Sequence, residues 1–153
     1  MPSALAVPRL TGLLTRSPRV GELVDAAPSV RVGRGSRVES ATGLVIGEGV
    51  TIGRGCQIEA DGAIGDGSVL SNGVRVQGPG RVELEGENWV GAGATLVAPV
   101  TLERGAVVAP GSVVTGHVPA MAIASGDPAR VIGARFSDDV LRGEEDERLA
   151  TAV

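Results

Sequence analysis

Few residues in this chain of 153 could carry out acid–base or metal chemistry. There is one histidine, His117, and one cysteine, Cys56, so the chain offers neither an internal disulfide nor a cluster of metal ligands. We therefore expect no metal site. An unperturbed imidazole titrates near neutral pH, which makes His117 an obvious general base to consider. It directly precedes Val118 and Pro119, however, and the simpler interpretation is a surface turn.

A second set of candidate bases is the row of alternating acids Glu83, Glu85 and Glu87. Alternate residues share one face of any strand, so these three side chains would project together. A glutamate can act as a general base when burial raises its pKa towards neutrality. The simpler interpretation is again a solvated edge or loop. The catalytic residue is therefore unknown from the sequence.

The elements that would position these groups are set by a six-residue repeat. Aliphatic residues recur at every sixth position in three series of shifted phase, and each shift corresponds to about two inserted residues. The series are Val32, Val38 and Leu44; then Ile46, Ile52, Ile58, Ile64, Leu70, Val76 and Val82; then Val90, Leu96, Leu102, Val108 and Val114. The position four residues after most of them is small or β-branched, as at Ser36, Cys56, Gly62, Ser68 and Ala94.

A period of six is neither helical nor a simple strand alternation. It predicts a triangular coil, in which each side is one short strand and each corner one tight turn. The aliphatic residue points inward and stacks on its equivalents in neighbouring coils, while the small residue lies near the corner. Three such hexads make a coil of roughly 18 residues, so the repeat predicts about five coils of an all-β parallel β-helix. An irregular β-sandwich would not produce a fixed period.

Composition agrees with a narrow core of similar short strands. The chain has 24 Gly residues, one Trp, one Phe and no Tyr, and its apolar residues are mostly Val, Ala, Leu and Ile. The net charge is −4 and no basic stripe stands out along the sequence, which argues against nucleic acid as a partner. No stretch is long and apolar enough to cross a bilayer, and we expect a soluble cytoplasmic protein without membrane contact.

The repeat divides the chain into four parts. Residues 1–28 do not follow it and are expected to form an N-terminal arm or cap, and residues 29–120 form the β-helix domain. Residues 121–136 are a chain-reversal segment, because Gly126 permits a positive φ and Pro128 fixes the following turn. Ser137 followed by Asp138 is typical of a helix start, so residues 137–153 are expected to hold a short C-terminal α-helix and tail.

From Trp89 onward the sequence is WVGAGATLVAPVTLERGAVVAPGSVVTGHVPAMAIASGDPARVIGAR. This segment resembles the C-terminal half of the hexapeptide-repeat acetyltransferases, which act on sugars, antibiotics and serine. The matches run over 89–91, 100–102, 107–119 and 126–132. The resemblance implies a left-handed β-helix, a homotrimer, and an acyl-CoA such as acetyl-CoA as co-substrate in a groove between two β-helices.

The resemblance also implies which residues line the CoA groove. Small residues would let the pantetheine arm lie against the backbone, and Arg130 could meet a phosphate. The cofactor-binding residues implied in this way are Trp89, Gly91, Ala92, Ala109, Gly111, Ser112, Thr115 and Arg130.

The chain departs from the family at three points. The family's usual catalytic histidine, which lies upstream of the Trp, has no counterpart, since the segment 71–88 holds no His. Pro110 stands where the family usually has Ala and removes a backbone N–H, and Gly116 replaces a lysine.

Two functions stay open. The chain is an acyltransferase that moves an acetyl or similar group from acyl-CoA to a hydroxyl or amine of a small molecule such as a sugar, or it is a non-catalytic hexapeptide-repeat scaffold or binding protein.

Overall fold

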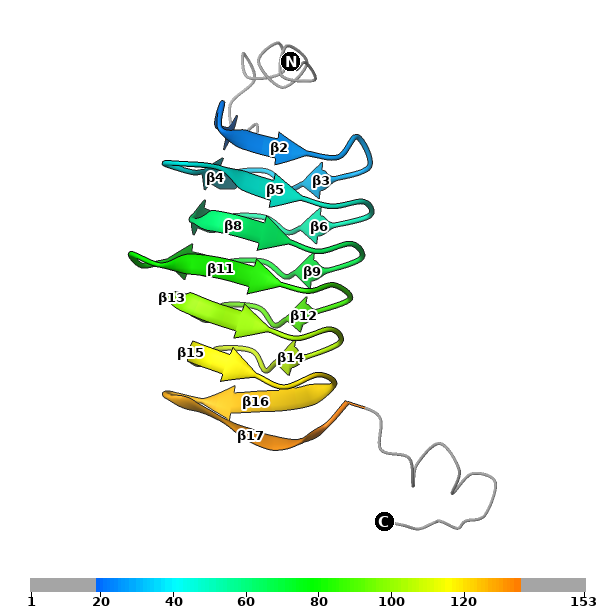
Figure 1. Cartoon of the computed structure of the whole chain (residues 1–153), viewed down its shortest axis with the longest axis vertical. Helices are drawn as coiled ribbons and strands as arrows, with labels where there is room; N and C mark the ends of the chain where they lie inside the picture. Colours follow the sequence, from blue (N-terminus) through cyan, green and yellow to red (C-terminus); the bar gives the residue numbers. More distant parts are fainter. Residues whose placement is uncertain (1–18, 136–153) are drawn as a thin grey trace, which may run out of the picture.

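The computed structural model describes residues 19–135, and within that range every element is a β-strand. The strands wind into a three-sided parallel solenoid of about six coils, stacked along the long axis of the molecule (Figure 1). Side 1 holds β1 (Arg19–Val20), β4 (Arg37–Glu39), β7 (Gln57–Glu59), β10 (Arg75–Gln77) and the first halves of β13 (Thr95–Leu102) and β15 (Val113–Val118).

Sides 2 and 3 complete each coil. Side 2 holds β2 (Val24–Ala26), β5 (Leu44–Ile46), β8 (Asp61–Ile64), β11 (Arg81–Leu84) and the second halves of β13 and β15. Side 3 holds β3 (Arg31–Val32), β6 (Thr51–Ile52), β9 (Val69–Leu70), β12 (Trp89–Val90), β14 (Val107–Val108), β16 (Ala122–Gly126) and the antiparallel β17 (Ala129–Ala134). We call the corner between sides 3 and 1 corner A, that between sides 1 and 2 corner B, and that between sides 2 and 3 corner C.

The core is the predicted aliphatic column. In strands of two to four residues the side chains alternate between outside and inside, so one apolar residue per side points inward. Parallel pairing then stacks equivalents, as in Ile52 against Leu70 and Val38 against Ile58. Every member of the three aliphatic series is buried except Val32, which lies near the first coil and is half-buried. The six-residue period therefore predicted both the solenoid and its core.

The small companion residues are explained by close contact between coils at the corners. Gly62 has φ +131°, and a Cβ added there would lie 2.0 Å from the carbonyl oxygen of Val82 in the next coil. Ser36, Cys56 and Ser68 are fully buried at the corners that directly precede β4, β7 and β9. Thr42, four residues after Val38, is exposed because it lies in the longer corner of coil 2.

Both phase shifts of the repeat map to corner B. In coils 2 and 4 the inward residues on either side of this corner are six positions apart, Val38 to Leu44 and Val76 to Val82, whereas in coil 3 Ile58 and Gly62 are only four apart. Two extra residues in coils 2 and 4 therefore make protruding corner loops on either side of a tight corner. This difference creates the hollow described below.

The ends of the solenoid differ in part from the sequence boundaries. β1 and β2 pair with β4 and β5, so the first coil already begins at Arg19, inside the segment assigned to the arm. The six-residue spacing in fact continues backwards from Val32 through Ala26 to Val20, so the repeat extends into this coil. At the other end, Gly126 has φ +111° and the chain reverses into β17. The expected C-terminal helix lies outside the described residues. Within 19–135 there is no helix that is long and apolar enough to cross a membrane.

Candidate functional site

Five of the residues assigned to the CoA groove come together along corner A in the last coils. Gly91 and Ala92 form this corner in coil 4, and Ala109 and Gly111 form it in coil 5. The Gly111 N–H donates to the carbonyl oxygen of Ala92 at 2.9 Å, so the two turns are stacked directly. The fifth residue, Ser112, is buried beneath them. Ala92 and Gly111 are exposed, which leaves a bare edge of backbone and small side chains.

Backbone packing requires the small residues at this edge. A Cβ on Gly91 would lie 2.5 Å from the nitrogen of Pro110, so no side chain fits there. The Ser112 hydroxyl accepts a hydrogen bond from the Gly126 N–H at 3.0 Å and so ties the chain-reversal segment to the corner. Ser112 thus has a structural role that is sufficient to explain it.

The other three predicted groove residues, Trp89, Arg130 and Thr115, are not part of this corner. Trp89 is on β12 of side 3, two residues before corner A, and 39% of it is exposed. Arg130 is exposed on β17 and pairs with Ser125, next to Gly126. Thr115 lies on side 1 beside Val97, at the end of its strand half near corner B, so the fold does not bring it to the edge formed by the other residues.

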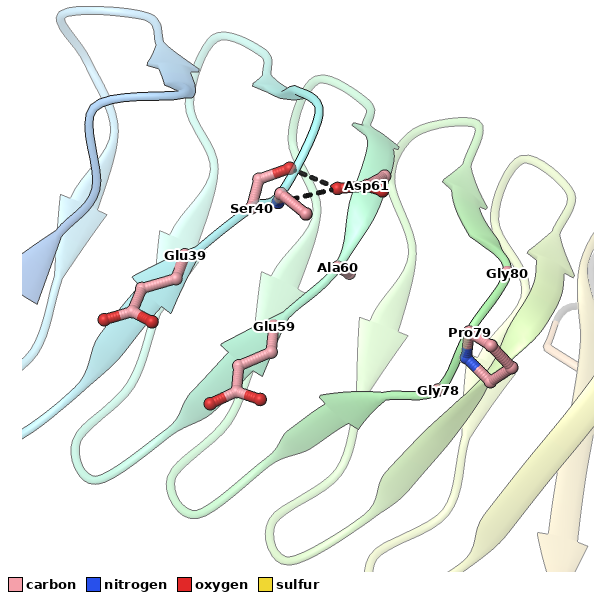
Figure 2. A pocket seen from close by; sticks show the side chains of 9 residues that line it. Glu39, Ser40, Glu59, Ala60, Asp61, Gly78, Pro79 and Gly80 are labelled. Carbon is pink, nitrogen blue, oxygen red and sulfur yellow. Dashed lines mark hydrogen bonds between the residues drawn. The ribbon is translucent and has the colours of Figure 1, made fainter.

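A hollow with a volume of about 460 Å³ lies at corner B, over coils 2 to 4 (Figure 2). The protruding loops of coils 2 and 4 form its walls, and the tight corner of coil 3 forms its floor. The carboxylates of Glu39 and Glu59 project in the same direction at one end of it. Its lining residues are Glu39, Ser40, Ala41, Glu59, Ala60, Asp61, Gly78, Pro79 and Gly80.

Asp61 fixes the shape of the wall that the coil 2 loop forms. One carboxylate oxygen accepts the Ser40 hydroxyl at 2.5 Å and the backbone N–H groups of Ala41 and Thr42, each at 3.0 Å. The Ser40 hydroxyl in turn accepts the Gly43 N–H at 2.9 Å. These donors, with the Ser40 hydroxyl contributing most, hold the pKa of the Asp61 carboxyl well below its ordinary value. Asp61 is therefore a fixed anion that organises the loop 40–43 and is a weak proton acceptor.

His117 has a carboxylate partner on side 2. It is an exposed residue of β15, and its Nε2 contacts the carboxylate of Glu103. The same carboxylate accepts the Ala120 N–H at 3.1 Å through its other oxygen. The pair lies in the last coils, away from the hollow at corner B.

The expectation that Glu83, Glu85 and Glu87 share one strand face is wrong. β11 ends at Leu84, so only Glu83 is on a strand, where it pairs with Arg81 at 3.1 Å. Glu85 and Glu87 lie in corner C, and Glu87 has φ +51°. The strand ends there because corner C needs a turn in every coil.

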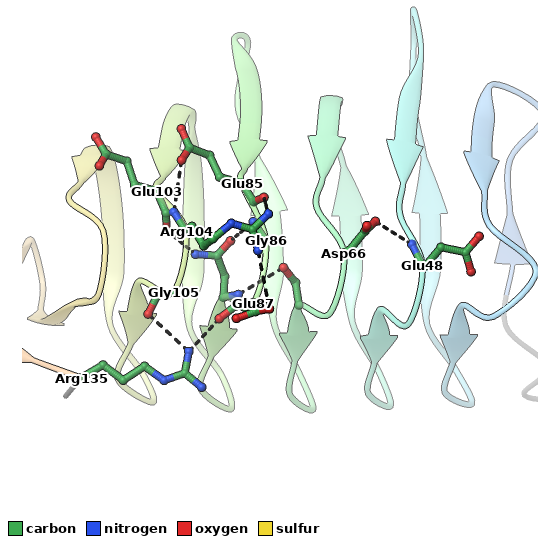
Figure 3. Close-up of polar contacts among 11 residues, drawn as sticks. Glu48, Asp66, Glu85, Gly86, Glu87, Glu103, Arg104, Gly105 and Arg135 are labelled. Carbon is green, nitrogen blue, oxygen red and sulfur yellow. Dashed lines mark hydrogen bonds and ion pairs between the residues drawn. The ribbon is translucent and has the colours of Figure 1, made fainter. Parts of the chain in front are cut away.

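Polar side chains at corner C link successive turns (Figure 3). Asp66 accepts the Glu48 N–H at 2.9 Å, and Glu85 accepts the Arg104 N–H at 3.2 Å. The Arg135 guanidinium donates to the carbonyl oxygens of Glu87 and Gly105. These acids satisfy backbone donors of the neighbouring coil, so their roles here are structural. Within 19–135 no three His, Cys, Asp or Glu side chains are grouped so as to hold a metal ion.

The repeat region is similar in sequence to serine acetyltransferases. The chain is 34% identical over 115 residues to that of Salmonella typhimurium, which covers 75% of this chain and 40% of the relative. It is 36% identical over 124 residues to a probable serine acetyltransferase of Oryza sativa, with 80% and 39% covered. The chain thus spans about 40% of the length of these curated relatives. No protein-family profile matches it.

Solved structures share its fold. An N-acyltransferase of Bacillus cereus, AntD, in complex with dTDP and 3-hydroxybutyryl-CoA, superposes with a TM-score of 0.64 at 17% identity and 94% coverage of both chains. The polySia-specific acetyltransferase NeuO superposes with a TM-score of 0.59 at 20% identity, covering 86% of this chain and 73% of its own. The chain belongs to the hexapeptide-repeat, left-handed β-helix family.

Within this family fold, sequence reasoning missed the hollow at corner B. It sought a base in residues 71–88, whereas the only carboxylates that line the hollow are Glu39, Glu59 and Asp61 of coils 2 and 3. The signal was present in the two phase shifts of the repeat, which mark the corner loops that form its walls. Reading each shift as a loop of unknown position did not reveal that both loops lie at the same corner.

Proposed function

We propose that this chain is an acyltransferase, which moves an acetyl or similar group from acyl-CoA to a hydroxyl or amine of a small molecule such as a sugar. The observation that carries the proposal is the match to serine acetyltransferases over three quarters of the chain. The match covers only about 40% of the length of those relatives, so the activity, the substrate and the partners belong to the proposal and not to the match itself.

The bare edge at corner A is the proposed site for acyl-CoA. Pantetheine amides can pair with backbone groups at exposed turns, and the small residues Ala92 and Gly111 allow close approach. Arg130 is exposed near the end of the same edge and would meet a phosphate of CoA. Pro110 offers no N–H and the Gly111 N–H is engaged by the carbonyl oxygen of Ala92, so donors must come from other turn residues such as Ala92.

The hollow at corner B is the proposed place for the acceptor. In the reaction a carboxylate takes the proton of the acceptor hydroxyl or amine as that atom attacks the thioester carbonyl; the C–S bond breaks and CoA leaves as the thiol after protonation. Glu39 and Glu59 are the carboxylates that could serve there. Since CoA and acceptor lie at different corners of one chain, we propose that the groove forms between two copies of a homotrimer.

We place this reaction in the cytoplasm.

A binding measurement tests the cofactor part of the proposal. Acetyl-CoA at about 100 times its Kd should stabilise the fold by about 2.7 kcal/mol in thermal unfolding. The variant Ala92→Glu, at an exposed corner position, should lose this shift while it stays folded. The matched control Val45→Glu, at an exposed site on side 2, should keep it. No shift for the wild type at millimolar acetyl-CoA would contradict the proposal.

The alternative is a non-catalytic β-helix that acts as a scaffold or binding protein. One observation favours it: the single histidine is engaged with Glu103 in the last coils and no other imidazole is available. Release of free CoA thiol in the presence of a panel of sugars and amino acids separates the two functions. Binding of acetyl-CoA without any acceptor-dependent thiol release would favour the scaffold.

A further inference from the structure

Arginines from widely separated parts of the sequence meet on one half of side 1. Arg19, Arg37 and Arg75 occupy the same outward position of β1, β4 and β10, in register with Gln57 between the last two. Arg34 and Arg54 lie beside them at the tips of corner A in coils 1 and 2. We call these five residues the arginine ridge. All five are exposed.

The ridge is poor in internal partners. Only Arg37 has an ion pair, with Glu39 at 3.8 Å between two half-exposed side chains. The other four side chains make no ion pair or hydrogen bond with the residues the structure describes. All 14 cations of the chain are arginines, whose planar guanidinium groups match carboxylates and phosphates with two parallel hydrogen bonds. An exposed row in which four of five arginines have no partner among residues 19–135 is equipped for an anionic ligand.

The ridge has a direction and an end. Successive coils are about 4.8 Å apart, so its charges run parallel to the solenoid axis at a spacing of one or two coils. At corner A the position after Arg54 is Asn72 in coil 3, and Ala92 and Pro110 follow in coils 4 and 5; the strand positions after Arg75 are Thr95 and Val113. The ridge therefore leads, past the turn of Asn72, towards the bare edge proposed for acyl-CoA.

A parallel acidic column limits what can lie on the ridge. Glu39 and Glu59 stand two residues further along β4 and β7, about 6.6 Å from the arginine column. Nucleic acid carries a phosphate every few ångströms and stacks its bases on aromatic side chains. Side 1 has no aromatic residue, and the chain is acidic overall. A saccharide with one carboxylate per sugar suits the pattern better, because its hydroxyls can donate to the glutamates.

We propose that the arginine ridge binds a linear saccharide that carries carboxylate groups, and presents one of its hydroxyls to Glu39 or Glu59 as the acyl acceptor. The binding part stands on the ridge alone, and the acceptor part rests on the proposed acyltransferase function.

Direct binding without CoA tests the ridge. The probe is an oligogalacturonate of four to six sugars, measured by calorimetry at low salt. The double variant Arg37→Gln, Arg75→Gln should bind it about tenfold more weakly or worse. The control Arg81→Gln removes an exposed strand arginine on side 2 and should stay within about twofold of the wild type. A neutral maltohexaose should not bind.

Three results would overturn the inference: no binding of the oligogalacturonate, equal loss in the ridge and control variants, or tighter binding of an oligo-dT of matched charge. Acetyl-CoA shifts are recorded for the same variants. If the saccharide binds and acetyl-CoA does not, the proposed acyltransferase function is wrong and the saccharide site is retained. If acetyl-CoA binds and the saccharide does not, only the proposed saccharide site is wrong.

Discussion

At the scale of single residues, the chain's few chemical groups act mostly on their own backbone. Asp61 holds the loop 40–43 with three hydrogen bonds, and Asp66 and Glu85 each accept one backbone N–H at corner C. The Glu39 carboxylate is free to accept a proton because its one ion pair, with Arg37, is long at 3.8 Å and exposed to solvent. Glu59 has no hydrogen bond or ion pair with the described residues. Candidate chemistry is therefore restricted to the side chains that the turns do not need.

The low pKa of Asp61 makes stability depend on pH. The folded-state pKa lies below the ordinary value of about 3.9, so the carboxylate contributes stability above pH 4 that is lost as the pH falls below it. At pH 7 Asp61→Asn should lower the urea midpoint relative to the wild type. The difference should shrink progressively below pH 4.

Glu59→Gln is the control for that experiment, since this neighbouring carboxylate lines the same hollow. It should leave the urea midpoint at pH 7 nearly unchanged. If the Asp61 variant matched the wild type at pH 7, the loop 40–43 would not depend on the carboxylate.

At the scale of elements, the period of six predicted the strands and their inward residues because side chains alternate along every strand and each side of a coil turns an apolar residue inward. It could not predict which corner takes an insertion, since a two-residue shift has the same appearance wherever it falls between two aliphatic positions. The hollow at corner B depends on just that placement. The arginine ridge was hidden for a similar reason: Arg19, Arg37 and Arg75 are 18 and 38 residues apart and meet only through the coil register.

The groove residues at corner A were predictable from family resemblance, although their effect on CoA binding stays a prediction. Thr115 could not be placed without the fold, because only the strand register shows that it lies near corner B.

Asn88 is the buried polar link between two turns of corner C, and it should be sensitive to a change of one atom. Its Nδ2 donates to the carbonyl oxygens of Glu103 and Ala106, and its Oδ1 accepts the Gly86 N–H. Asn88→Asp replaces the donor by an acceptor facing two carbonyls. We expect a loss of about 2–4 kcal/mol of unfolding free energy in urea titration.

The matched control is Asn72→Asp. Asn72 is exposed and uses only its Oδ1, which accepts the Arg54 N–H at 2.8 Å, so the aspartate can keep this bond. Its unfolding free energy should change by less than about 0.5 kcal/mol. Equal effects in the two variants would mean that the amide of Asn88 is not a required donor.

At the scale of the whole molecule, side 3 presents an apolar outer column. Val69, Trp89, Val107 and Ile123 occupy equivalent outward positions on β9, β12, β14 and β16. Long aliphatic faces favour burial against another chain. Together with the family resemblance, this column supports a homotrimer as the functional unit.

Light scattering after size exclusion tests this expectation. The mass should be three times the 15.3 kDa of the chain at micromolar concentration. A monomer at all concentrations would remove the groove between copies, and with it the proposed meeting of CoA and acceptor.

The reversal of the chain into β17 closes one of the three sides of the last coil. β17 covers the edge of the side 3 sheet, whereas β15 borders sides 1 and 2 and, among the described strands, pairs only with β13. An unpaired strand edge is a template on which further strands can add. Within residues 19–135, growth into a fibre is thus blocked on one side by the chain itself, and any added rung must start from the two that remain.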